Sequence, residues 1–237
     1  MMSGGSGASG GIGAIREHYT PLPAGTLLWH VYPSKFKPHA FNPDSRNRFA
    51  LVPPPDQAMF YAGDCSACGL WEAILRNLVV DEKQPQHVDP AIVKGRSIAQ
   101  LKLLQEVLVL DLRSPHFRNL SVSAERHAEW QRLCIVPERH YDLTHAAARE
   151  LVTAAPRAAG LSWHSRQMSA QTAYVFYTPP LKPPAEFEVI DAIELDRPAG
   201  WALIDKALDG VGVERMGSSA LVKGIVDELP SDEFDGG

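Results

Sequence analysis

The chain has 237 residues, 45% of them hydrophobic, a fraction typical of a folded protein with a packed core. Its 23 Lys and Arg and 28 Asp and Glu give a formal net charge of −5, so the basic surplus typical of a nucleic-acid-binding protein is missing. No run of about 18 apolar residues and no N-terminal leader pattern occurs, so we expect a cytoplasmic protein without membrane contact. Three cysteines are too few for a disulfide framework.

Residues 1–13 are almost all Gly, Ser and Ala, and we expect them to form a flexible tail because they bury little apolar surface. They hold glycines at the spacing of a dinucleotide-binding fingerprint, but that fingerprint requires a preceding strand, which is missing here. Residues 14–210 are predicted to form a single domain, and residues 211–237 an acidic C-terminal tail.

Composition and periodicity predict the elements in chain order. Strands are expected over residues 26–32, 47–52 and 58–62, and a helix follows over 65–80 with Asp64 as its N-cap. Further strands are expected over 97–103, 107–112, 161–165, 172–177 and 187–195, and further helices over 124–133, 144–155 and 201–208. This order favours an α+β fold with a mixed sheet flanked by helices.

Glu72 and His30 are the first two residues that could carry chemistry. Glu72 lies on the predicted helix 65–80, either as a solvated carboxylate paired with Arg76 one turn away or as a functional group. His30 interrupts an apolar strand, and strand alternation places it on the same face as Tyr32. A buried histidine with satisfied nitrogens is one interpretation, and the polar wall of a pocket is the other.

Arg48 follows in the predicted strand 47–52, where an inward arginine requires an anion such as a phosphate or a carboxylate. The alternative is a charge at a sheet edge facing water. Cys65 and Cys68 form a C-x-x-C pair, but structural zinc requires two more ligands, and a redox dithiol usually lies in a thioredoxin-like context. Two small, partly buried residues are the simplest interpretation of this pair.

The segments LLWHVYPSKF, NRFAL, MFYAGDCSACGLWEAILR and GLSWHSRQ, taken in this order, resemble the RES-domain family between residues 26 and 195. The resemblance implies a toxin of a bacterial toxin–antitoxin pair, with a fold similar to that of the ADP-ribosyltransferase toxins. Family members cleave NAD at its nicotinamide bond and pass the ADP-ribose to phosphate, to water or to a protein. An Xre-like antitoxin is the partner that the resemblance implies.

The resemblance extends to single residues. Arg48, Tyr61, Glu72 and Ser165 match the arginine, tyrosine, glutamate and serine of the family motifs, whereas His30 stands where many members have arginine. A set of His30, Tyr61 and Glu72 is similar to the His-Tyr-Glu pattern of diphtheria-toxin-like transferases. This departure favours transfer to a protein over phosphorolysis.

The resemblance also implies a role for each residue around NAD, which is the substrate, with no metal required. Tyr61 and Trp71 would enclose the nicotinamide, and His30 would bind a ribose hydroxyl beside Tyr32. Arg48 would pair with the diphosphate, Glu72 would stabilise the charge that develops on the nicotinamide ribose, and Ser165 would orient the nicotinamide amide or the ribose.

Three hypotheses remain from the sequence. The first is a toxin that ADP-ribosylates a protein acceptor, and the second is an NAD phosphorylase or glycohydrolase that uses the same site. The third is a non-enzymatic module in which Cys65 and Cys68 bind a metal.

Overall fold

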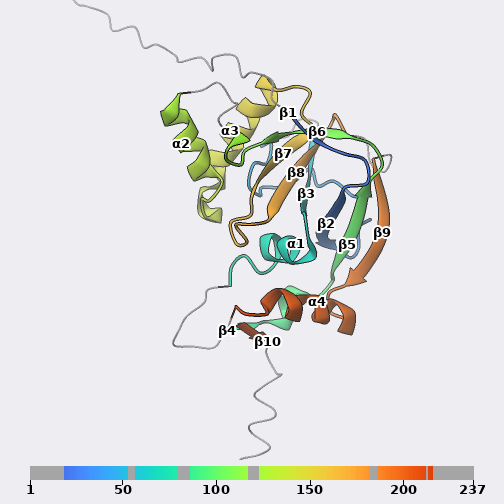
Figure 1. Ribbon diagram of the computed structural model, residues 1–237. Helices are drawn as coiled ribbons and strands as arrows, with labels where there is room; N and C mark the ends of the chain where they lie inside the picture. Colours follow the sequence, from blue (N-terminus) through green and yellow to red (C-terminus); the bar gives the residue numbers. More distant parts are fainter. Residues whose placement is uncertain are drawn as a thin grey trace, which may run out of the picture.

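The structure is a computed structural model and describes residues 19–52, 57–78, 86–116, 123–181, 186–211 and 213–215. The predicted tail 1–13, with its glycine motif, and most of the predicted tail 211–237 lie outside these residues. Within them, a curled eight-stranded mixed sheet is flanked by four α-helices, which confirms the predicted α+β class (Figure 1).

The main sheet has the order β1-β6-β7-β8-β3-β2-β5-β9, and every neighbouring pair is antiparallel except β6 and β7. Its strands are β1 (Tyr19–Leu22), β2 (Leu27–Pro33), β3 (Ala58–Gly63), β5 (Arg96–Leu103), β6 (Val107–Asp111), β7 (Gly160–His164), β8 (Thr172–Thr178) and β9 (Phe187–Glu194). The short strands β4 (Gln86–Val88) and β10 (Val213–Arg215) pair in parallel with each other. The helices are α1 (Ser66–Ala73), α2 (Ala124–Leu133), α3 (Tyr141–Ala154) and α4 (Pro198–Leu208), and short 3₁₀ turns span Pro90–Ile92 and Glu138–His140.

Most predicted elements coincide with observed ones to within a few residues, but the predicted helix 65–80 is too long. Helix α1 ends at Ala73 because Ile74 and Leu75 both donate their backbone N–H to the Leu70 carbonyl, which closes the last turn. The N-cap is Cys65 and not the predicted Asp64, whose carboxylate instead accepts a hydrogen bond from the Thr172 N–H. The domain also continues past the predicted boundary at residue 210, because β10 pairs with β4.

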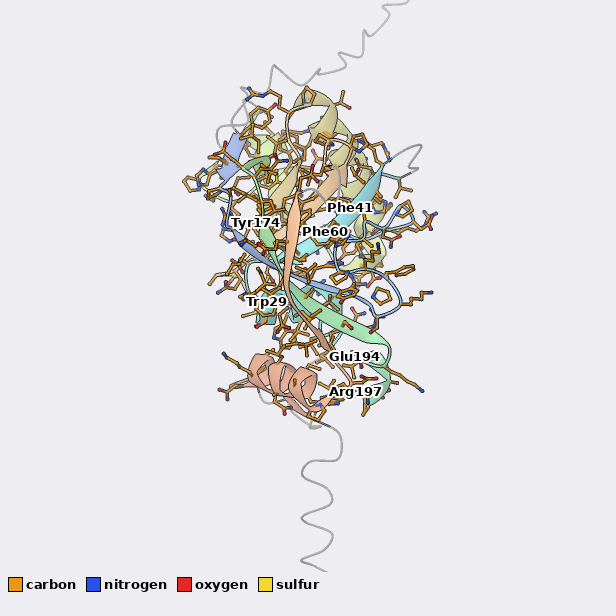
Figure 2. All side chains as sticks on the ribbon, turned by 90° about the vertical axis from the view of Figure 1, so that its right-hand side faces the viewer. Trp29, Phe41, Phe60, Tyr174, Glu194 and Arg197 are labelled. Carbon is orange, nitrogen blue, oxygen red and sulfur yellow. The ribbon has the colours of Figure 1, made fainter. Side chains whose placement is uncertain are left out.

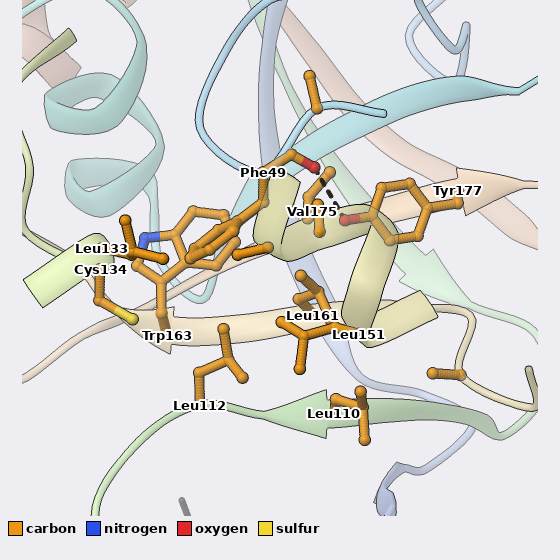
Figure 3. Packing of buried hydrophobic residues seen from close by; sticks show 14 of the residues in the cluster. Phe49, Leu110, Leu112, Leu133, Cys134, Leu151, Leu161, Trp163, Val175 and Tyr177 are labelled. Carbon is orange, nitrogen blue, oxygen red and sulfur yellow. Dashed lines mark hydrogen bonds between the residues drawn. The ribbon is translucent and has the colours of Figure 1, made fainter. Parts of the chain in front are cut away.

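The predicted strand 47–52 is wrong, since these residues form turns. Phe49 has a positive φ of 57°, which a strand excludes. Tertiary contacts hold it there: its N–H donates to the Thr144 hydroxyl at 2.9 Å, and its carbonyl accepts from the Tyr177 hydroxyl at 2.9 Å (Figure 3). The Phe49 ring is 1% exposed and packs edge-on against Trp163. Burial of the Phe49 ring and the hydrogen bonds of its backbone therefore favour a turn, although the local sequence is typical of a strand.

Alternation along the strands sorts side chains onto two faces of the sheet. One face is the interior of the curl, where Phe60 of β3 packs with Phe41 (Figure 2). The Phe60 ring also contacts the rings of Phe176 and Phe187. The opposite face is covered in two parts. Helices α2 and α3 pack on the half with β6, β7, β8 and β3, and helices α1 and α4 pack on the half with β2 and β5.

The two halves of the sheet meet where β2 and β3 lie side by side. Almost no backbone pairing joins these two strands. Their register holds one pair, Trp29 with Gly63, whereas β2 pairs with β5 over seven residues. Helix α1 starts directly after β3 and packs so closely that a Cβ on Gly63 would lie 2.7 Å from the Gly69 nitrogen. The centre of the sheet is therefore an opening with α1 at its side.

Candidate active site

A pocket of about 630 Å³ lies at this opening between β2 and β3. Elements distant in sequence supply its walls, namely both strands, α1, the loop that follows β2, and the ends of β5, β7, β8 and α3. Residues from the sequence prediction that line it are His30, Tyr32, Arg48, Tyr61 and Glu72. The structure thus brings five of the seven predicted residues to one pocket, and Ser165 lies directly behind Glu72.

His30 spans the opening between the two strands. Its Nδ1 lies 2.5 Å from the Tyr61 carbonyl oxygen. A carbonyl oxygen only accepts, so Nδ1 carries the proton and donates it. The backbone of β2 makes no register pair with Tyr61, and the imidazole takes that place. Burial lowers the pKa of His30 to about 4. The ring is therefore neutral at pH 7, with Nε2 as an acceptor, the form that binds a hydroxyl. Its ring stacks with Tyr32 at 5.7 Å and 9°, as predicted from their shared strand face.

Glu72 lies in the last turn of α1, and its carboxylate is fixed from a distant part of the chain. Its Oε1 accepts a 2.6 Å hydrogen bond from the Ser165 hydroxyl and a 2.9 Å bond from the Arg166 N–H. The Ser165 hydroxyl in turn accepts from the Met168 N–H at 3.1 Å, which sets the direction of the chain of bonds. Within the described residues Oε2 has no such partner and is free for a ligand. The pairing with Arg76 considered from the sequence is not formed, because Arg76 binds Glu138 and Asn47.

Tyr61 extends from β3 on the face that carries helices α2 and α3. Its hydroxyl is buried and has no hydrogen bond of normal geometry within the described residues, although the Ser45 hydroxyl lies near it. Burial raises the pKa of Tyr61 well above its usual range, so the phenol stays neutral. A neutral ring on a pocket wall suits stacking against a flat ligand.

The structure does not give Arg48 and Trp71 the surroundings that the sequence predicted. The Arg48 guanidinium donates to the carbonyls of Leu133 and Val136, at 2.6 and 2.8 Å, and lies over the Tyr141 ring. Arg48 is 3% exposed. Backbone carbonyls at the end of α2 accept its hydrogen bonds, in place of the anion that the sequence predicted. Trp71 is absent from the pocket wall because its indole N–H donates to the Ala207 carbonyl in the core between α1 and α4.

Cys65 and Cys68 have structural contacts at the start of α1. The Cys65 sulfur caps the helix by accepting from the Cys68 N–H at 3.4 Å, and the Cys68 thiol lies 3.6 Å from the Thr172 carbonyl. Burial raises the pKa of both thiols, so the acidification considered for a redox pair is not found. Among the residues that the structure describes, no three His, Cys, Asp or Glu side chains gather in a way that could hold a metal ion.

Several residues of the pocket were not predicted from the sequence. Those with polar or aromatic side chains include Phe36, Lys37, Arg76, Arg96, Tyr141 and Trp163. Trp163 precedes Ser165 by two residues in GLSWHSRQ, so its place in that segment was a usable signal. No local sequence pattern marks Lys37 or Arg96 as a pocket residue. Lys37 lies in the loop after β2 and Arg96 at the start of β5, and only the fold brings the two to one pocket.

A comparison with known protein families identifies the family of this chain. Residues 25–198 match the sequence model of the RES domain. The chain therefore belongs to the RES-domain family, which confirms the predicted family. The crystal structure of the M. tuberculosis MbcT–MbcA toxin–antitoxin complex is similar with a TM-score of 0.47 and 9% identity, over 73% of this chain and 86% of that one. No curated protein matches the chain. In the described part of the chain no helix has the length and apolar character to cross a membrane.

Proposed function

We propose that this protein is the toxin of a toxin–antitoxin pair that cleaves NAD and transfers the ADP-ribose to a protein acceptor. The observation that carries the proposal is the state of Glu72, which has one carboxylate oxygen fixed by Ser165 and Arg166 and the other free. Glu72 faces the same pocket as the neutral His30 and the Tyr61 ring. This set matches the His-Tyr-Glu pattern of NAD-dependent transferases that the sequence resembles.

The reaction assigns one task to each group. The bond between the nicotinamide nitrogen and the ribose C1′ breaks, and its electron pair leaves with neutral nicotinamide. The ribose then carries positive charge, which the Glu72 carboxylate stabilises because it is already oriented and partly shielded from water. The Tyr61 ring stacks on the nicotinamide, and His30 Nε2 accepts a hydrogen bond from a ribose hydroxyl. A nucleophile of the acceptor protein adds to C1′ and loses its proton.

The second candidate is an NAD phosphorylase or glycohydrolase, in which phosphate or water attacks the same carbon. The favouring observation is the open Glu72 oxygen, since a carboxylate there can also accept a proton from water. His30 favours transfer to protein because a neutral acceptor stands where many family members carry a permanent cation. An Xre-like antitoxin that covers the pocket and a cytoplasmic target rest on the family resemblance and belong to the same proposal.

The test uses NAD labelled in its adenylate half, incubated with the purified protein, phosphate and a cytoplasmic extract. Labelled protein supports transfer, free ADP-ribose supports hydrolysis, and ADP-ribose 1″-phosphate supports phosphorolysis. Release of free nicotinamide measures all three reactions together. Glu72→Gln serves as the inactive control, and metal analysis of the purified chain tests the binding module on Cys65 and Cys68. Intact NAD after prolonged incubation with protein that a thermal melt shows to be folded would contradict the proposal.

A further inference from the structure

The pocket has an outer end whose chemistry the proposed reaction does not yet use. There, the loop that follows β2 and the start of β5 place Phe36, Lys37 and Arg96 on the pocket wall. Arg96 stands opposite Pro33 in the β2–β5 register, and the Ser34 N–H donates to the Gly95 carbonyl at 2.9 Å. These contacts join the loop to β5, so the two cations belong to one rim of the pocket.

The cations at this rim are not neutralised by the protein. Among the described residues, no acidic side chain forms an ion pair with Lys37 or Arg96. The acid on the neighbouring strand, Glu194, is paired with Arg197 at 2.9 Å (Figure 2). Asp44 also lines the pocket, but it forms no ion pair with either cation. The chain as a whole carries a net charge of −5. Two unpaired cations at the pocket rim make the electrostatic potential locally positive, which attracts an anion.

Arg48 is already held by the protein in the present structure, although it lines the pocket and its buried Nε has no hydrogen-bond partner among the described residues. Its two terminal nitrogens are bound to the Leu133 and Val136 carbonyls, and the residue is 3% exposed. A dinucleotide carries two phosphate charges that need partners once they leave water. The cationic groups that remain free along the same pocket are Lys37 and Arg96.

Phe36 supplies a second kind of contact on the same pocket wall, and the Lys35 ammonium lies 5.0 Å from the centroid of its ring. It is 55% exposed, lies on the pocket wall and is an exception among the aromatic residues, most of which are buried. A flat apolar ring next to cationic side chains is the combination that nucleotides bind, by stacking of the base and pairing of the phosphate. The outer end therefore has the chemistry of a nucleotide phosphate site.

We propose that Lys37 and Arg96 bind a phosphate group of the dinucleotide substrate, and that Arg48 does not. This inference rests on the proposed function for the identity of the substrate. The phosphate has two sources, the diphosphate bridge common to NAD and NADP and the 2′-phosphate that NADP alone carries. Because neither phosphate changes its charge when the nicotinamide bond breaks, the contact is the same in the ground state and in the transition state, and it acts mainly on KM.

The test compares Lys37→Ala, Arg96→Ala and the double variant with Lys94→Ala, an exposed lysine outside the pocket and two residues from Arg96. For each, kcat and KM are measured with NAD and with NADP, and the thermal melt is recorded. We expect KM to rise about 10-fold in each single variant, with kcat and melting temperature unchanged. An equal rise for both dinucleotides assigns the cations to the diphosphate, and a rise for NADP alone assigns them to the 2′-phosphate. Unchanged KM for both substrates would overturn the inference while the proposed function stands.

A binding measurement separates the two proposals. ADP-ribose and ADP-ribose 2′-phosphate are each titrated calorimetrically into the wild-type protein and the double variant, and adenosine is used as the ligand without phosphate. Loss of ADP-ribose affinity in the double variant supports the phosphate site, even if the wild-type protein leaves NAD intact and the proposed function fails. Equal affinity of both proteins for ADP-ribose and for ADP-ribose 2′-phosphate would contradict the site.

Discussion

The Ser165 hydroxyl donates a 2.6 Å hydrogen bond to Oε1 of Glu72, and this bond joins residues 93 positions apart in sequence. Ser165 is 2% exposed and does not line the pocket, whereas Glu72 does. The serine that the sequence resemblance assigned to the substrate is thus in contact with the carboxylate. We infer that Ser165 is a positioning residue, which fixes one oxygen of Glu72 and leaves the other for the substrate.

Replacement of Glu72 by Gln is expected to lower kcat about 100- to 1000-fold, the usual effect of removing one preorganised electrostatic group. The amide keeps the size of the side chain and an oxygen that Ser165 and Arg166 can bind, so the fold should persist. Nicotinamide release and a thermal melt are the two measurements. Glu188→Gln, on the exposed edge strand β9, is the matched control and should behave like the wild type. A Glu72→Gln variant that turned NAD over at the wild-type rate would remove Glu72 from the mechanism.

Replacement of Ser165 by Ala is expected to lower kcat about 10-fold with little change in KM, because the carboxylate loses a donor but keeps its charge. Ser165→Thr retains the hydroxyl and should recover part of the rate. In a Glu72→Gln background, Ser165→Ala should have much less effect, since the two residues act as a unit. A full additional 10-fold loss in that background would show that Ser165 acts independently of Glu72.

Replacement of Arg48 is expected to destabilise the fold, in contrast to the loss of NAD binding predicted from sequence. Arg48→Met leaves the Leu133 and Val136 carbonyls without their donors, at a cost of about 2–4 kcal/mol in the free energy of unfolding. Urea unfolding measures this cost, and the exposed Arg46→Met is the control. A stable Arg48→Met protein with a greatly raised KM for NAD would restore the original assignment.

The stability of the protein should fall as the pH drops from about 6.5 to about 4. The pKa of His30 is lowered to about 4 in the folded protein from 6.5 in the unfolded chain. In this window the unfolded chain therefore binds more protons, and stability rises with pH. The contribution is at most roughly 3 kcal/mol, is complete above pH 6.5 and is lost below pH 4. His30→Asn should have a flatter stability profile over this range.

The control for this measurement is His164→Asn, which removes an exposed histidine from β7. Its stability profile should follow that of the wild type, because the side chain is exposed and far from the opening that His30 spans. Carboxylates that titrate in the same window are common to all three proteins, so only the difference between profiles counts. Identical slopes for wild type and His30→Asn would contradict the assigned burial of the imidazole.

Local pattern was sufficient to predict much of this protein. The strand alternation of LLWHVY correctly placed His30 and Tyr32 on one face, and the predicted helix 124–133 coincides with α2. The order of motifs was sufficient to identify the RES-domain family. These features depend on neighbouring residues or on their order along the chain, and for this reason a single sequence reveals them.

Long-range contacts decided the rest. Residues 47–52 have the composition of a strand, yet bonds from Thr144 and Tyr177 hold Phe49 in a turn. Arg48 is a candidate for anion binding in sequence, but the end of α2 takes up its guanidinium. Each outcome depends on partners about 85 to 130 positions away, which no local pattern encodes.

The sequence by itself determined the α+β class, the family and the candidate residues His30, Tyr61 and Glu72, because periodicity and motif order are properties of the chain. Tertiary structure alone decided that β2 and β3 separate after Trp29 and Gly63, which opens the pocket between them. It also decided that Ser165 holds Glu72 and that Lys37 and Arg96 remain free at the rim. Which polar groups are hydrogen-bonded and which side chains are buried depends on contacts between segments that are distant in sequence. These contacts form only in the folded protein.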